Sequence, residues 1–197
     1  MRSLRDRLGA GDLPPGRRIA AADLAQTLRL SATPVREALS RLAGEGLLDE
    51  MRGQGFYVPL YTAGDVADLY RLAWVQLWIG LAPDRPVVSP QPLDAPALGE
   101  DPIDAVDRLF AGWILQSGSR VLVASYRRTQ AQLSPLRRLE PQLFDDLSDE
   151  AAGLVQAARA SSRRAQLGTV RRFYDRRIVR AERLAALAAA RRDDAKI

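Results

Sequence analysis

The residues best suited to chemistry lie in the first third of the chain, and they favour contact with a polyanion. Ser31 and Thr33 stand at the start of an expected helix, where hydroxyl groups and free backbone N–H groups can bond phosphate oxygens. Arg36 lies one turn further on, and Arg52 stands beside Gly53 in an expected turn. A guanidinium group binds phosphates and also pairs with the acceptor edge of guanine. These residue types at this spacing predict binding to double-stranded DNA.

Two helices joined by a tight turn are expected to position these side chains. Residues 21–28 have helical periodicity, and a second helix begins near Ser31 or Thr33, either of which can cap it. Pro34 fits the first turn, and the helix is expected to end at Gly44. Its expected buried face consists of Val35, Ala38, Leu39 and Leu42. In such a pair, the start of the second helix can enter the major groove.

A β-hairpin is expected to follow the second helix. Two short strands, 47–49 and 56–58, flank a glycine-containing turn that places Arg52 at its tip, within reach of a neighbouring groove or backbone. Pro59 ends the second strand, so a first domain is predicted over residues 1–60. The alternative is a small structural helical domain whose hairpin contacts no nucleic acid.

The composition excludes several kinds of site. The chain has no cysteine and no histidine, which rules out disulfides, zinc ribbons, thiol nucleophiles and imidazole bases. The net charge of +5 suits a polyanion, although a GC-rich genome also explains why Lys196 is the only lysine. The N-terminus lacks an apolar signal-peptide core, and no apolar run approaches the ~20 residues of a membrane span. We therefore expect a soluble cytoplasmic protein.

The remainder, residues 61–197, is expected to form an all-helical domain. The expected helices cover residues 63–81, 103–117, 119–134, 136–146, 148–160 and 163–191, and a proline-rich loop covers 83–102. The predicted fold is therefore mainly α. It combines an N-terminal winged helix-turn-helix, with a small β-hairpin wing, and an all-α C-terminal helical bundle.

Residues 11–58 resemble the winged helix of the GntR family of bacterial transcription regulators. The matching segments are GDLPPG at 11–16, DLA at 23–25, SATPVREAL at 31–39, RL at 41–42, EGLL at 45–48 and GQGFYV at 53–58. The resemblance implies DNA contacts by Ser31, Thr33 and Arg36, and at Gly53 beside Arg52. Two positions depart from the family pattern. Ala32 replaces an arginine that contacts bases, and Arg29 replaces the turn glycine, where it can supply positive charge or remain solvated.

The C-terminal half resembles the FadR C-terminal class of effector domain, often called FCD. The matching segments are DVADLY at 65–70, DRLFA at 107–111 and SGS at 117–119, followed by Leu122. Many such domains bind a metal through one aspartate and three histidines. Asp107 matches the aspartate, but Ala111 and Phe173 stand where histidines are expected. A lone carboxylate is a poor transition-metal site, so no metal and no cofactor are predicted.

Aromatic and basic side chains of this half are candidates for binding an effector. The candidate residues are Trp74, Trp78, Asp107, Trp113, Tyr126 and Arg127. The aromatic members either line an apolar pocket or pack the core. Arg127, with Arg120 and Arg128, either holds a carboxylate or faces solvent. The arginines of the last predicted helix, Arg163, Arg164, Arg171, Arg172, Arg176, Arg177, Arg180 and Arg183, are expected mostly to face solvent, with a second nucleic-acid surface as the alternative.

These observations favour a homodimeric transcription regulator, a repressor modulated by a small-molecule effector. Apolar stripes on 63–81 and 167–178 suggest a dimer formed through the C-terminal half. The alternative is a metal-free and ligand-free dimeric architectural or partner-binding protein. An enzyme fused to the DNA-binding module, as in aminotransferase-like relatives, would need a Schiff-base lysine, and Lys196 near the chain end cannot serve.

Overall fold

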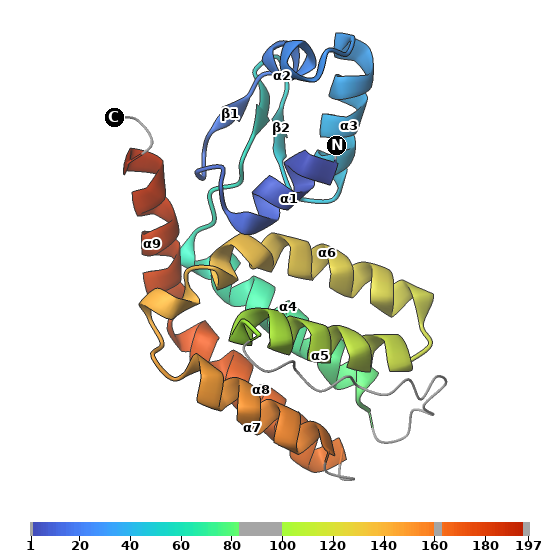
Figure 1. The fold of residues 1–197 in the computed structure, drawn as a ribbon, viewed down its shortest axis with the longest axis vertical. Helices are drawn as coiled ribbons and strands as arrows, with labels where there is room; N and C mark the ends of the chain where they lie inside the picture. The colour runs from blue at the N-terminus through green and yellow to red at the C-terminus, as the bar shows by residue number, and fades with distance from the viewer. Residues whose placement is uncertain (1, 83–99, 160–162, 195–197) are drawn as a thin grey trace.

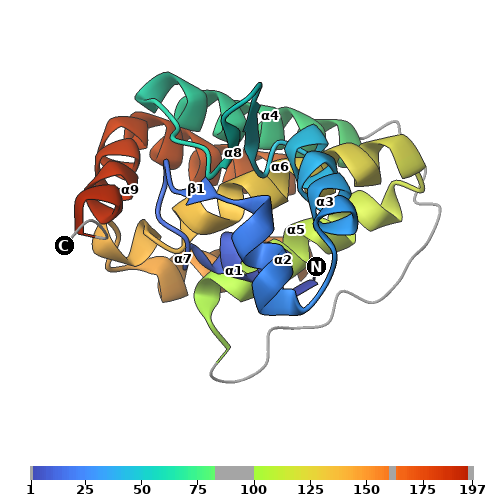
Figure 2. The ribbon, with the colours of Figure 1, turned by 90° about the horizontal axis from the view of Figure 1, so that it is seen from above.

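The computed structural model describes residues 2–82, 100–159 and 163–194 as a winged helix standing on one end of a helical bundle (Figures 1 and 2). The winged helix contains α1 Arg2–Ala10, β1 Arg18–Ile19, α2 Ala21–Leu28, α3 Ala32–Gly44, β2 Asp49–Met51 and β3 Gly55–Tyr57. The bundle contains α4 Ala63–Gly80, α5 Pro102–Gln116, α6 Arg120–Arg137, a 3-10 turn at Glu140–Gln142, α7 Leu147–Arg159, α8 Arg163–Val179 and α9 Ala181–Asp194. The fold is mainly helical, as the sequence predicted.

The winged helix has a three-stranded antiparallel sheet in the order β1-β3-β2. The sequence predicted two strands, at 47–49 and 56–58: the second matches β3 to within one residue, the first begins two residues too early, and β1 was missed. Leu47 instead bonds back to the end of α3, where its N–H donates to the carbonyl of Leu42, and the first hairpin strand begins at Asp49. The two residues of β1, paired with Phe56 and Tyr57 of β3, are too few to show the alternation that reveals a strand.

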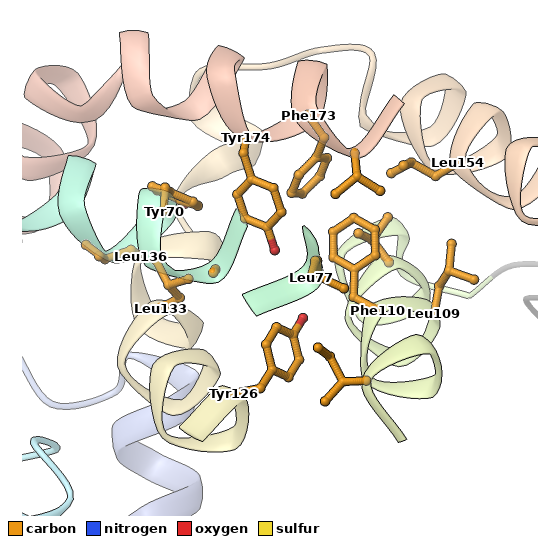
Figure 3. Close-up of a cluster of buried hydrophobic side chains, with 14 of the residues drawn as sticks. Tyr70, Leu77, Leu109, Phe110, Tyr126, Leu133, Leu136, Leu154, Phe173 and Tyr174 are labelled. Carbon is orange, nitrogen blue, oxygen red and sulfur yellow. The ribbon is translucent and has the colours of Figure 1, made fainter. Parts of the chain in front are cut away.

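Helix α4 packs against α5, α6, α8 and α9 on one side and keeps its other face exposed. Aromatic and leucine side chains from these helices fill the core (Figure 3). The rings of Phe110 and Tyr174 stack at a centroid distance of 5.8 Å, and Phe173 meets Phe110 edge-on at 5.1 Å. No helix in the described ranges is long and apolar enough to cross a lipid bilayer.

Side-chain caps fix where three bundle helices begin, and at α6 the Ser119 hydroxyl accepts from the backbone N–H of Leu122. Thr62 and Asp65 form a reciprocal capping box at the start of α4. The Asp101 carboxylate accepts from the backbone N–H groups of Ile103 and Asp104, with Pro102 as the first residue of α5. The proline-rich loop predicted over 83–102 therefore ends earlier than expected, and its part at 83–99 lies outside the described residues.

Two of the predicted helices were wrong. Instead of a helix over 136–146, α6 runs through Pro135 to Arg137, because a proline in the last turn removes only one backbone hydrogen bond. The predicted helix over 163–191 is divided at Arg180 into α8 and α9. There the N–H of Arg180 bonds the carbonyl of Arg177, three residues back, which tightens the backbone between the two helices.

The winged helix contacts the bundle through α1, which lies on α6 (Figure 1). The Ser134 hydroxyl donates to the carbonyl of Gly9 at 2.9 Å, and the Gln132 amide donates to the carbonyl of Gly46 at 3.2 Å. Helix α9 stands beside the connection between the domains (Figures 1 and 2). This docking leaves the turn between α2 and α3 at the end of the molecule furthest from the bundle (Figure 1).

Candidate DNA-binding interface

The start of α3 presents a set of exposed hydrogen-bond donors. Ser31 is the N-cap residue, in extended conformation, and its side chain makes no capping hydrogen bond. The hydroxyls of Ser31 and Thr33 and the guanidinium of Arg36 are all exposed. The first backbone N–H groups of a helix lack partners within it and carry the positive end of its dipole. The amino-terminal end of α3 is therefore suited to binding phosphate oxygens. Arg36 lies one turn further along the same helix.

The orientation of α3 is set by its apolar face. Val35, Leu39 and Leu42 retain only 1%, 0% and 4% of their exposure and pack into the core of the winged helix. Ala38, expected in the same stripe, is only partly buried. Because these residues recur every three or four positions, they turn Arg36 toward solvent.

Arg29 occupies the turn between α2 and α3 in a left-handed conformation, with φ 53° and ψ 42°. Its N–H bonds the carbonyl of Gln26, and it ends α2 as a C-cap. This conformation favours glycine, so an arginine here carries a conformational cost of about 1–2 kcal/mol. The side chain is exposed and two positions from Ser31, which adds a cation next to the start of α3.

The wing places Arg52 at the tip of the β2–β3 hairpin, fully within solvent reach. Gly53 has φ 74°, and a side chain on it would meet nothing within 4 Å, so the turn needs its conformation and not its small size. Arg18 of β1 donates from Nε to the carbonyl of Gln54 at 2.9 Å and braces this turn. Sequence reasoning missed Arg18 because the two-residue strand that holds it shows no pattern.

The candidate DNA-binding residues are distributed over two elements. Arg29, Ser31, Thr33 and Arg36 lie at the α2–α3 turn and on α3, and Arg52 and Gly53 lie on the wing. Among the described side chains, no carboxylate lies within ion-pair distance of the three arginines. Their charges are therefore available to an external anion. Glu50 of β2, the acidic residue nearest to Arg52 in sequence, accepts a hydrogen bond from Ser40 of α3 at 3.4 Å.

The candidate effector residues do not form one cavity. Trp113 and Tyr126 are 2% exposed and belong to the bundle core, with Trp113 stacked on Phe110 at 5.6 Å. Trp74 is partly buried, whereas Trp78, at 53% exposure, and Arg127 face solvent. The structure therefore brings two of the aromatic residues together as packing and leaves the others apart.

Asp107 has a cationic partner from α6. Its carboxylate forms an ion pair with Arg137, which is 3% exposed. The guanidinium carbon of Arg137 also lies 5.3 Å from the ring centroid of Phe173. One arginine thus contacts both Asp107 and Phe173, two positions that the resemblance to the FCD class associates with a metal. Within the described ranges, no three or more acidic side chains converge as metal ligands.

A second buried arginine completes an ion cluster in the bundle. Arg177 binds both Glu140, at 2.8 Å and 3.0 Å, and Glu150, at 2.7 Å and 3.0 Å, and Tyr70 donates to Glu140 at 2.9 Å. Burial by itself would raise the pKa of Glu140, but Arg137 and Arg177 hold that pKa below its ordinary value. Burial raises the pKa of the Tyr70 hydroxyl well above its usual range.

Three arginines of α8 that were expected to face solvent are bound to other parts of the bundle instead. Arg177 is fully buried in the cluster. Arg176 binds both oxygens of Asp146, at 2.6 Å and 2.9 Å, and Arg163 donates to the carbonyl of Ala82 at 3.0 Å. Helical periodicity could not distinguish these residues from Arg171 and Arg172, which are exposed as expected, because their partners come from distant parts of the sequence.

Comparisons with known proteins identify the N-terminal domain. Residues 1–58 match the family model described as bacterial regulatory proteins, gntR family. The Nta operon transcriptional regulator of Aminobacter aminovorans is 45% identical over 58 residues, which are 29% of this chain and 28% of that protein. The HTH-type transcriptional regulator McbR of Escherichia coli strain K12 is 37% identical over 71 residues, 36% of this chain and 32% of that protein. The chain thus matches about a third of the length of these curated relatives.

Solved structures show that the likeness in fold extends over both domains. The structure of E. coli McbR covers 92% of this chain and 94% of its own with a TM-score of 0.71 and 21% sequence identity. A Rhodococcus sp. RHA1 protein described as a GntR regulator covers 91% and 94% with a TM-score of 0.74 and 17% identity. The arrangement of a winged helix on a helical bundle is therefore shared with these proteins.

Proposed function

We propose that the chain is a gntR-family transcription regulator that binds an operator in double-stranded DNA and acts as a homodimeric repressor. One observation carries this function. The exposed donors of α3 and the exposed arginine of the wing lie in a domain whose opposite side is docked on the bundle (Figure 1). The DNA-binding elements are thereby held out from the rest of the molecule, and their cations have no partner among the described carboxylates.

The residues divide between positioning and reading the DNA. Ser31, Thr33 and the end of α3 bind phosphates, which sets the depth and register of the helix in the major groove. Arg36, one turn inside the helix, reaches a base edge. Ala32 offers no donor at the position where the family has an arginine, so Arg29 and Arg52 supply more of the charge. The preferred operator therefore differs from that of relatives carrying the arginine.

The dimer is proposed to form through α4. Its outward face carries Leu72, Val75, Trp78 and Ile79, which are 46%, 45%, 53% and 37% exposed. Their spacing of three and four residues makes one continuous apolar stripe. The apolar stripe expected on α8 cannot form the dimer interface, because Val170, Phe173 and Tyr174 are already buried within the same chain. A second copy paired along α4 would give two winged helices related by a two-fold axis, as a palindromic operator requires.

The helical bundle is proposed to be an FCD-like domain that works without a metal. Arg137 supplies the positive charge that Asp107 would otherwise need from a cation. Because Trp113 and Tyr126 fill the core, the bundle interior by itself favours the second candidate function, a ligand-free dimeric architectural protein. The two functions differ in the sequence preference of the DNA-binding domain and in any response to a small molecule.

Selection of bound genomic fragments with the purified protein tests the proposed function. The selected duplex and a random duplex of equal length are then titrated at several salt concentrations. A regulator should prefer the selected duplex by about a thousandfold or more at physiological salt. Equal affinity for both duplexes would support the architectural protein instead. Salt-independent binding would contradict contact with phosphates by either kind of protein.

A further inference from the structure

An apolar cleft lies where the winged helix meets the bundle. Its walls come from the N-terminal domain and linker, including Leu13, Val58 and Pro59, from α6 and the turn after it, including Pro135 and Leu139, and from Ala188 of α9. The cavity volume is about 50 Å³, and the cleft opens to solvent beyond it, so the enclosed part has room for a small ligand only. The candidate effector residues of the bundle are not among its walls.

Three polar side chains line this cleft, and two of them already donate to the protein backbone. Gln132 and Tyr61 line it and both donate to the carbonyl of Gly46, at 3.2 Å and 3.4 Å. Arg191 of α9 lines the opposite side. A side chain on Gly11 would come within 3.2 Å of Arg191 Nη1, so the guanidinium reaches the loop after α1. Gly11 has φ 73°, a conformation that itself favours glycine and so keeps this approach open.

The polar residues that line the cleft include a cation but no anion. No carboxylate is among the lining residues, and no described acidic side chain is within ion-pair distance of Arg191. Burial raises the pKa of the Tyr61 hydroxyl above its ordinary value, so it remains a neutral donor. A group that enters the cleft therefore meets apolar walls, the second N–H of the Gln132 amide and the Arg191 cation. This chemistry suits a carboxylate joined to an apolar body.

We propose that the cleft is an effector site for a small apolar carboxylic acid, held by Arg191 through its carboxylate and by the proline and leucine walls through its apolar body. The regulatory consequence rests on the proposed function, whereas binding at the cleft does not. The ligand contacts both the DNA-binding domain and the bundle. It therefore stabilises one relative orientation of the two, and in a dimer that orientation sets the separation of the two α3 helices.

The test uses the full-length protein and straight-chain carboxylates from butyrate to decanoate, with the corresponding primary amides as uncharged controls. Binding is measured by titration calorimetry without DNA. Each methylene that fits the cleft should tighten binding by about fourfold. The amides should bind about tenfold or more weakly than the acids. Arg191→Gln should lose a similar factor for the acids, and Arg183→Gln, an exposed arginine on the same helix, should bind them as the wild type does.

Three outcomes overturn the site. They are no saturable binding of any acid at millimolar concentration, equal binding of acids and amides, and wild-type affinity in Arg191→Gln. A parallel titration of the selected operator, with and without the acid of the series that binds most tightly, separates this proposal from the proposed function. If the protein binds the acid but no operator, the ligand site is supported and the proposed function as a regulator is contradicted. Operator binding without acid binding does the reverse.

Discussion

Arg177 and Glu140 form a two-point ion pair in the middle of the helical bundle, with both side chains fully buried. Nη2 and Nε of the guanidinium lie 2.8 Å and 3.0 Å from the two carboxylate oxygens. The Arg177 guanidinium also lies over the ring of Phe173, 3.4 Å from its centroid. Neither charge has access to water, so each depends on its buried ionic partners, which also include Glu150 for Arg177 and Arg137 for Glu140.

Glu140→Gln should lower the free energy of unfolding by about 3–5 kcal/mol, because it leaves a buried arginine without its main counter-charge. Urea titration followed by circular dichroism measures the loss. Asp146→Asn is the matched control. It removes a carboxylate from the solvent-exposed pair with Arg176 and should cost at most about 1 kcal/mol. Equal effects of the two variants would contradict the structural role of the buried pair.

Acid should weaken the wild type more than Glu140→Gln. The folded pKa of Glu140 lies below its ordinary value of 4.5, so in acid the unfolded chain binds more protons than the folded chain does. The stability that this carboxylate contributes is present above that value and declines as pH falls through the folded pKa. Unfolding curves between neutral pH and about pH 3 should therefore converge for the two proteins.

No zinc, nickel or manganese should copurify with the protein. Asp107 is paired with Arg137, and the chain contains no histidine, so the ligands that such ions prefer are missing. Elemental analysis of protein purified without chelator measures this directly. About one transition-metal ion per chain that disappears in Asp107→Ala would show that a metal displaces Arg137 from the carboxylate.

Trp78→Glu should convert the dimer into a monomer. It places a charge in the exposed apolar stripe of α4, where a second copy would have to bury it unpaired. Sedimentation at micromolar concentration gives the mass of the wild type and the variant. Val179→Glu changes a more exposed apolar residue outside the stripe, at 79% exposure, and should remain dimeric. A monomeric wild type would contradict the proposed dimer itself.

Arg29→Gly should separate folding from DNA binding. The substitution removes the conformational cost of an arginine in the left-handed region, which stabilises the folded chain. Glycine also gives the unfolded chain more conformational freedom, which opposes this gain, so the free energy of unfolding should change by no more than about 1 kcal/mol. Affinity for DNA should fall, and the slope of log affinity against log salt should decrease by about one unit if the guanidinium contacts a phosphate. Unchanged affinity and slope would show that Arg29 is only solvated.

The sequence predicted the recognition elements because local signals specify them. Pro34 and the spacing of Val35, Leu39 and Leu42 were enough to place α3 and its buried face. The short strand β1 carried too few residues for any pattern, so Arg18 was missed. Pro135 misled the analysis because proline ends helices in their interiors but is tolerated in a last turn.

The buried ion cluster and the interdomain cleft could not be predicted, because both depend on long-range contacts. Arg177 has the same kind of helical neighbours in sequence as the exposed arginines, and its partners Glu140 and Glu150, 37 and 27 residues away, are what distinguish it. Arg191 and Gly11 lie close together in space although they come from opposite ends of the sequence. Such pairs appear only once the bundle is assembled and the winged helix is docked.

Fluorescence anisotropy on the selected operator, with Arg36→Ala beside the wild type, tests the central claim most directly. Loss of a base contact should weaken operator binding by about 1–3 kcal/mol and relax the preference over random duplex. Arg164→Ala changes an exposed arginine in the first turn of α8, outside the winged helix, and should bind as the wild type does. Wild-type affinity and preference in Arg36→Ala, or an equal loss in Arg164→Ala, would contradict recognition of DNA by α3.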